Sequence, residues 1–171
     1  MNSYLEKSPN AGRMGKAAEY LVASFCILVS QGRLNVSTSM IDDEGVDLVF
    51  HQRGGTATLA VQVKARMLSG TVAARGRFQA FVRSQTFTSR SDLALLFVAV
   101  DDEHGQLRQA WLVPSDEFDK RKGTPTAQGR YRFSASLKPG TQDQWALYRL
   151  EPLELPGAIL RSLDGLEVSD R

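Results

Sequence analysis

The chain has 171 residues, a mass of 18.9 kDa and a formal net charge of +2. Its 42% hydrophobic and 23% charged residues are typical of a soluble globular protein and argue against a disordered, collagenous or membrane-spanning chain. The single cysteine, Cys26, excludes an internal disulfide framework and a zinc site of several cysteines, and it fits a reducing, cytoplasmic setting. We interpret residues 1–171 as a single domain.

The first predicted element is a helix over residues 14–30. Its apolar residues recur at three- and four-residue steps, which places them on one face. They are Met14, Ala18, Leu21, Val22, Phe25, Leu28 and Val29. Glu19 lies at the border of this face, where its carboxylate either reaches water or points into a site at a sheet edge.

Two strands of one hairpin are predicted next, over residues 45–52 and 58–65. Both segments alternate apolar and polar residues, as half-buried strands do. Between them, Gly54 and Gly55 are typical of a type I′ turn, in which both central residues have positive φ. The two segments are therefore expected to pair as antiparallel neighbours.

The same turn predicts which residues of the hairpin face each other. With the two glycines as the loop, Phe50 lies opposite Leu59, so the apolar faces match. Asp47 is then expected opposite Gln62, with Lys64 one pleat further along the same face. An acid, an amide and an amine are thereby expected on one patch of the sheet.

The segment between His51 and Ser91 contains no acidic residue. It holds seven basic ones, namely Arg53, Lys64, Arg66, Arg75, Arg77, Arg83 and Arg90. The segment is either a solvated basic face or a phosphate-binding surface, for which arginine is well suited by its bidentate geometry. On the second interpretation, the candidate nucleic-acid contacts are Arg66, Arg75, Arg77 and Arg83, around a mobile loop expected over residues 68–79. The phenylalanines among them are expected in the core.

Strands and short helices are predicted for the rest of the chain. The expected strands span residues 78–83, 92–101, 110–113 and 131–137, and the near-continuous apolar run over 92–101 predicts a buried central strand. The expected helices span residues 115–122, 142–150 and 157–163. Ser115 is predicted to cap the first of them, and Trp111 and Trp145 are expected in the core.

The segment Gly45-Val46-Asp47-Leu48-Val49, followed by Val61-Gln62-Val63-Lys64, resembles the core of the PD-(D/E)XK nuclease superfamily. This superfamily includes restriction endonucleases and Holliday-junction resolvases. Its pattern has an Asp at the start of one strand and an acid or Gln, any residue and Lys on the next, and a helix Glu, matched here by Glu19, often joins the site. The sequence departs from the commonest pattern because Val46 replaces a Pro and Gln62 replaces an acid. The resemblance implies an α/β fold, an α/β/α sandwich around a mixed central sheet as in restriction endonucleases.

The resemblance also implies a metal-dependent endonuclease that hydrolyses phosphodiester bonds in DNA. Mg²⁺, or Mn²⁺ as a substitute, prefers oxygen ligands and keeps several waters. The implied ligands are the carboxylates of Asp47 and Glu19, the side-chain oxygen of Gln62 and the carbonyl of Val63. Lys64 would stabilise charge on the phosphate or orient the attacking water.

Other interpretations remain open. Asp47 and Lys64 are otherwise a cross-strand ion pair on a solvated face. The acids at 42–44 form either an exposed loop or, through Asp43 or Glu44, part of a second metal site. The neutral Gln62 favours an alternative function, a catalytically inactive domain that binds nucleic acid or a protein partner, and a purely structural module is a third.

The expected partners follow from size and motifs. The sequence contains neither GxxxxGK[ST] nor GxGxxG, so no nucleotide cofactor is expected. No membrane association is expected, because the polar residues 1–13 lack the apolar core of a signal peptide and the apolar stretch 21–29 is too short to span a bilayer. A domain of this size leaves DNA specificity to its loops, to a homodimer or to a partner protein.

Overall fold

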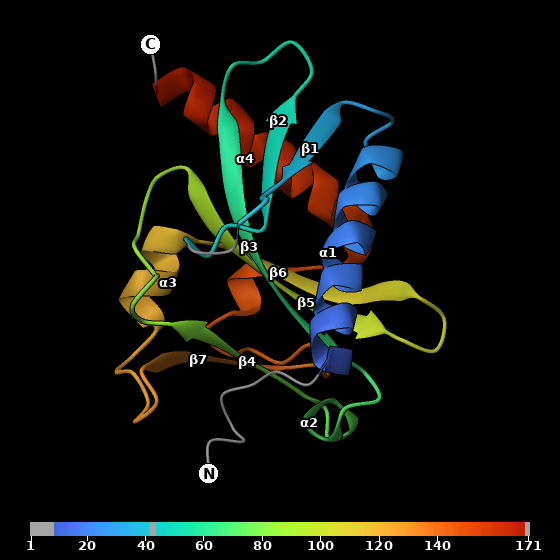
Figure 1. Ribbon diagram of the computed structural model, residues 1–171, viewed down its shortest axis with the longest axis vertical. Helices are drawn as coiled ribbons and strands as arrows, with labels where there is room; N and C mark the ends of the chain where they lie inside the picture. Colours follow the sequence, from blue (N-terminus) through green and yellow to red (C-terminus); the bar gives the residue numbers. More distant parts are fainter. Residues whose placement is uncertain (1–8, 42–43, 170–171) are drawn as a thin grey trace.

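The computed structural model describes residues 9–41 and 44–169 (Figure 1). A six-stranded sheet forms its centre, in the order β1-β2-β3-β5-β6-β8, and β3 and β5 run parallel while the other neighbours run antiparallel. These strands are β1 (Leu34–Thr38), β2 (Leu48–Gln52), β3 (Thr58–Met67), β5 (Leu93–Asp101), β6 (Gln106–Pro114) and β8 (Arg149–Leu150). A separate antiparallel pair, which we call the ribbon, consists of β4 (Arg77–Arg83) and β7 (Arg130–Ser136).

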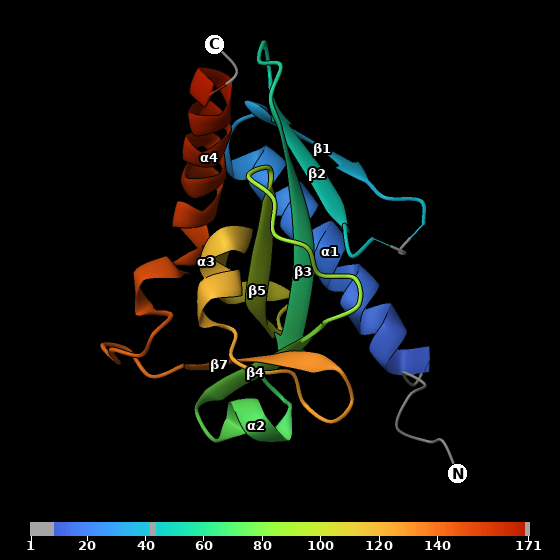
Figure 2. The ribbon, with the colours of Figure 1, turned by 90° about the vertical axis from the view of Figure 1, so that its left-hand side faces the viewer.

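Two long helices, α1 (Pro9–Val29) and α4 (Leu155–Ser169), lie on one face of the central sheet. The shorter helices are α2 (Thr71–Ala74) and α3 (Ser115–Arg121), and the 3-10 turns are η1 (Ala146–Tyr148) and η2 (Pro152–Glu154). Figure 2 shows α1 passing behind β2 and β3, with the ribbon crossing near the lower end of β3. The predicted mixed α/β fold with helices flanking a central sheet is confirmed, although the ribbon shares the second flank with α3. Across the described ranges, no helix is long and apolar enough to cross a membrane.

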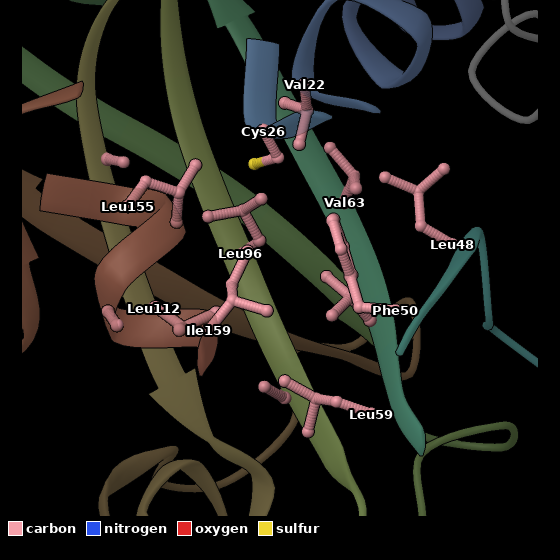
Figure 3. Close-up of a cluster of buried hydrophobic side chains, with 14 of the residues drawn as sticks. Val22, Cys26, Leu48, Phe50, Leu59, Val63, Leu96, Leu112, Leu155 and Ile159 are labelled. Carbon is pink, nitrogen blue, oxygen red and sulfur yellow. The ribbon is translucent and has the colours of Figure 1, made fainter. Parts of the chain in front are cut away.

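The first face of the sheet, under α1 and α4, is buried by a largely aliphatic core that also includes Phe50 (Figure 3). In α1 the buried residues Ala18, Val22 and Cys26 recur every four positions, and in α4 Leu155 and Ile159 do the same. This spacing gives each helix one apolar face toward the strands. Cys26 is fully buried in this core, and burial raises the pKa of its thiol to about 12.

The second face carries an aromatic core under the ribbon and α3. Its large rings belong to Phe78, Phe97, Trp111, Phe118, Phe133 and Trp145. Phe97 of β5 stacks on Phe133 of β7 with ring centroids 3.7 Å apart, which joins the ribbon to the sheet. The expected burial of Trp111 and Trp145 is confirmed. Phe81 differs from the expectation, because it lies on the outer side of the ribbon.

The hairpin keeps the predicted register with a different turn. Phe50 faces Leu59, as expected. Only the first glycine of the pair has positive φ, at Gly54, and the amide of Gly55 donates to the carbonyl of Gln52 at 3.0 Å. The turn is therefore not type I′. The loop is stabilised by α4 instead, because the Glu167 carboxylate accepts hydrogen bonds from the backbone amides of Thr56 and Ala57.

Several elements differ from the prediction because a segment distant in sequence provides their strand or hydrogen-bond partner. Strand β1, which was not predicted, pairs with β2 at the sheet edge. The helix expected over 142–150 is reduced to η1 because Arg149 and Leu150 pair with β6 as β8. Ser115 is not a helix cap: its hydroxyl donates to the Arg90 carbonyl and accepts from the Arg90 amide.

Candidate active site

Asp47 lies immediately before β2, where this strand separates from β3. Its amide donates to the carbonyl of Val61 at 3.0 Å, and its Oδ2 accepts from the amide of Val63 at 2.7 Å. The carboxylate thus accepts the hydrogen bond of the Val63 amide, which would bond to the backbone of β2 if that strand were longer. For this reason the strand begins at Leu48 rather than at Gly45 as predicted.

The carboxylate of Asp47 is placed beside the middle residue of the Gln62-Val63-Lys64 segment. The ladder ends at Leu48, so the expected strand pairing of Asp47 with Gln62 does not form. The carboxylate contacts the backbone between Gln62 and Lys64 instead. The carboxylate thus contacts the backbone of the strand that bears the amide and the amine, through a side-chain hydrogen bond rather than through the ladder.

Gln62 and Lys64 project from β3 onto the second face of the sheet. Their partners on β5 are Leu95 and Phe97, both members of the aromatic core. Gln62 is 8% exposed and Lys64 is half-buried. The amide and carbonyl of a strand residue point the same way, so the carbonyl of Val63 lies on the side of Asp47.

The backbone at Gly45 packs directly against the Gln62 side chain. Gly45 has φ +71, and a Cβ built there would lie 2.8 Å from Nε2 but 3.8 Å from Oε1 of Gln62. A larger residue would be strained and would displace this amide. The oxygen of Gln62 is therefore the end turned away from Gly45.

Glu19 contributes from α1, where it forms an ion pair with Lys16. The Lys16 Nζ lies 2.6 Å from Oε2 of Glu19, whose side chain is 13% exposed. The hydrogen bond to Glu19 raises the pKa of Lys16 above its usual value, and the charge of Asp47 adds to this effect. The charges of both carboxylates thus favour the protonated form of Lys16.

The donor set suits a hard cation with few protein ligands. Asp47, Gln62 and Val63 offer one carboxylate and two neutral oxygens, and Mg²⁺ commonly binds through one or two carboxylates while keeping several waters. Within residues 9–41 and 44–169, no three or more His, Cys, Asp or Glu side chains are grouped to hold a metal ion. Asp43 lies outside the described residues, and Glu44 is exposed.

The four predicted nucleic-acid contacts are all exposed but lie on different elements. Arg66 continues the polar face of β3, and its Nε donates to the carbonyl of Gln79 on β4 at 2.9 Å. Arg75 follows α2, which forms part of the loop expected over 68–79. Arg77 and Arg83 are the two ends of β4. The structure thus divides them among β3, the end of α2 and the ribbon.

Sequence reasoning missed three cations that the fold places near these groups. Lys16 is three residues before Glu19, a spacing that predicts a helical ion pair. Arg130 and Arg132 of β7 pair with Arg83 and Phe81 on β4, and their alternation in a strand was the available signal.

A separate hollow lies away from the candidate site. It measures about 310 Å³, is lined by residues such as Leu59, Leu93 and Ser162 beside α4, and includes none of the candidate catalytic residues.

Comparison with known proteins finds a match among solved structures. No protein-family model matches the sequence, and no curated protein does. Among solved structures, the fold is similar to that of a bacterial homing endonuclease, I-Ssp6803I, with a TM-score of 0.62 over 96% of this chain and 99% of that chain. The two sequences are 18% identical. The similarity establishes a shared fold.

Proposed function

We propose that this chain is a metal-dependent endonuclease that hydrolyses phosphodiester bonds in DNA. The observation that carries the proposal is the contact of the Asp47 carboxylate with the backbone between Gln62 and Lys64. It supports the proposal because it places an anionic oxygen against the strand that carries Gln62 and Lys64. The fold shared with a homing endonuclease supports the same activity.

Each residue has a distinct role in this proposal. Asp47, Gln62 and the Val63 carbonyl would hold Mg²⁺, with Mn²⁺ as a substitute, and Glu19 would join directly or through water. The bound cation supplies charge neutralisation at the phosphate and a more acidic water. Lys64 stabilises the charge that develops on the phosphate oxygens or orients the attacking water.

The ion pair of Lys16 and Glu19 has a supporting role. Lys16 holds the carboxylate of Glu19 in place, and its own positive charge lies near Asp47. We further propose that two copies of the chain, or a partner protein, act together, because one site cuts one strand of a duplex.

The alternative is a domain of the same fold that binds nucleic acid or a protein without cutting. It is favoured by the neutral Gln62 and by the engagement of Glu19 with Lys16, since both lower the negative charge available to a metal. Cleavage assays separate the two functions.

The test measures cleavage of linear, nicked and branched DNA with Mg²⁺ or Mn²⁺. Asp47→Asn is the informative variant because an amide oxygen can still accept from Val63, so the fold is kept while the charge is lost. We expect Asp47→Asn and Lys64→Ala each to lower the rate at least about a hundredfold. The control is Asp164→Asn, an exposed acid of α4 on the first face of the sheet.

Two results would contradict the endonuclease. One is a wild type that cuts none of these substrates with either metal, and the other is Asp47→Asn that cuts as fast as wild type. Gln62→Glu refines the test, because the added carboxylate should raise Mg²⁺ affinity if Gln62 is a ligand.

A further inference from the structure

The ribbon buries one face and turns the other outward. Its inner residues, each at most 1% exposed, are Phe78, Ala80, Val82, Phe133 and Ala135. The alternate positions make up the outer face, which carries Arg77, Gln79, Phe81 and Arg83 from β4 and Arg130, Arg132, Ser134 and Ser136 from β7. Neither strand contains an acidic residue.

Four arginines share this outer face without acidic partners. Arg83 stands directly opposite Arg130 in the antiparallel register, an arrangement of like charges that destabilises a strand pair. Throughout the described part of the chain, the ion pairs of arginine involve Arg90, Arg108 and Arg121, none of which is on the ribbon. The outer face therefore opposes folding electrostatically and is complementary to a polyanion.

The arginine side chains are held in a defined array. The guanidinium groups of Arg130 and Arg132 lie 5.7 and 5.9 Å from the centre of the Phe81 ring. Such cation–π contacts restrict both side chains. Arg77 is held separately, because its Nη2 donates to the hydroxyl of Ser134 at 2.8 Å. A surface that presents cations in fixed positions is suited to a regular array of phosphates.

The ribbon also has the dimensions of a groove-binding element. The major groove of B-form DNA is about 12 Å wide and admits a two-stranded antiparallel ribbon. Seven strand residues extend about 23 Å, which covers roughly seven base pairs at about 3.4 Å each. Duplex RNA offers a deep, narrow major groove that side chains cannot read.

A direct contact joins the ribbon to the candidate active site. Arg66, two residues after Lys64 on the same face of β3, donates to the carbonyl of Gln79 in the middle of β4. Two residues of a strand span about 7 Å. A duplex held by the ribbon would therefore lie next to the strand that bears Gln62 and Lys64.

We propose that the outer face of the ribbon binds B-form duplex DNA in the major groove, with Arg77, Arg83, Arg130 and Arg132 on the flanking phosphates. The choice of DNA as the polyanion rests on the proposed function, whereas the binding face rests on the ribbon alone. Binding is measured without divalent metal, so it does not depend on cleavage.

The experiment compares affinities for a labelled duplex DNA across a salt series in EDTA. The test variants are Arg130→Ala/Arg132→Ala and, on the other strand, Arg77→Ala/Arg83→Ala. The control removes the same charge from exposed positions elsewhere, as Arg108→Ala/Arg161→Ala. We expect each ribbon pair to lower affinity about tenfold or more and to reduce the log–log salt slope by about two, while the control keeps the wild-type slope. Urea midpoints confirm that each variant is folded.

Each outcome bears on the proposal. If both ribbon pairs bind like wild type, or if the control loses as much affinity, the ribbon is not the binding face, whether or not the wild type cuts. Tighter binding of duplex RNA than of duplex DNA would also overturn it. A wild type that binds DNA through the ribbon but cuts nothing supports the binding face and contradicts the endonuclease.

Discussion

The first face of the central sheet is aliphatic from β1 to β6, whereas the second face is aromatic over β5 and β6 and polar over β3. The aliphatic face is closed by two long helices. The aromatic face is closed by the ribbon and α3, and the strand beside this cover carries Gln62, Lys64 and Arg66. The candidate active site thus lies where the aromatic cover ends.

The alternation of a β-strand explains how β3 serves both faces. Val61 and Val63 are buried in the aliphatic core, while Gln62 and Lys64 between and beside them reach the other face. Because neighbouring side chains point to opposite sides, a polar site on one face does not interrupt the apolar packing on the other. This separation can be tested by perturbing one face at a time.

The largest effect is expected from truncation of the aromatic core. Phe97→Ala should lower the free energy of unfolding by about 3–5 kcal/mol, because it removes the ring that stacks on Phe133 and joins the ribbon to the sheet. Leu96→Ala, the next residue of the same strand, faces the aliphatic core and should cost about 2–5 kcal/mol. Urea unfolding followed by circular dichroism measures both.

Tryptophan emission makes this pair of variants informative about the faces. Both tryptophans, Trp111 and Trp145, lie in the aromatic core. Phe97→Ala should therefore alter the emission of the folded protein, while Leu96→Ala should leave it unchanged. The opposite pattern would show that the two cores are not packed independently.

A smaller loss of stability is expected from removal of the Ser115 hydroxyl, which connects the start of α3 to the loop before β5. Ser115 is fully buried and exchanges hydrogen bonds with both backbone groups of Arg90 at 2.6 and 2.9 Å. Ser115→Ala leaves these groups without the partner and should destabilise by about 1–3 kcal/mol in urea unfolding. Ser162→Ala is the control, since its hydroxyl bonds only within α4. Equal losses would contradict the role of Ser115.

The smallest effect on stability is expected from lowering the pH, through Glu117 at the edge of the aromatic core. Glu117 of α3 accepts hydrogen bonds from Lys120, Tyr148 and Arg121, which lower its pKa to about 2 from the usual 4.5. A carboxyl group whose pKa is lowered in the folded protein stabilises the fold at pH values above its usual pKa of 4.5. This stabilisation is lost as the pH falls toward 2.

The difference in Tm between wild type and Glu117→Gln isolates this contribution. At pH 6 the difference in Tm should be no more than about 3 °C, because the carboxylate of Glu117 is partly exposed to solvent. It should disappear near pH 2. Thermal melts across this range measure it. A difference that grows as pH falls would reverse the assigned sign.

Much of the candidate site was accessible from sequence because it is local. The alternation of two short segments, with Gly54 and Gly55 taken as the loop between them, predicted the hairpin register at Phe50 and Leu59, and that register brings Asp47 to β3. The exact contact was not predictable, because the carboxylate of Asp47 replaces a strand pairing that alternation alone would extend. Lys16 was missed because its significance depends on a carboxylate from another element.

Patterns within one segment were sufficient for the helix faces, the central strand β5 and the acid-free stretch, because these depend on residues that are neighbours along the chain. The ribbon was not predictable in this way. Its acid-free outer face combines Arg83 with Arg130, which are distant in sequence and meet only because Phe78 and Phe133 pack into the same aromatic core. Burial of those rings brings the two strands together, and the outward alternation of their other residues then collects the arginines on one surface.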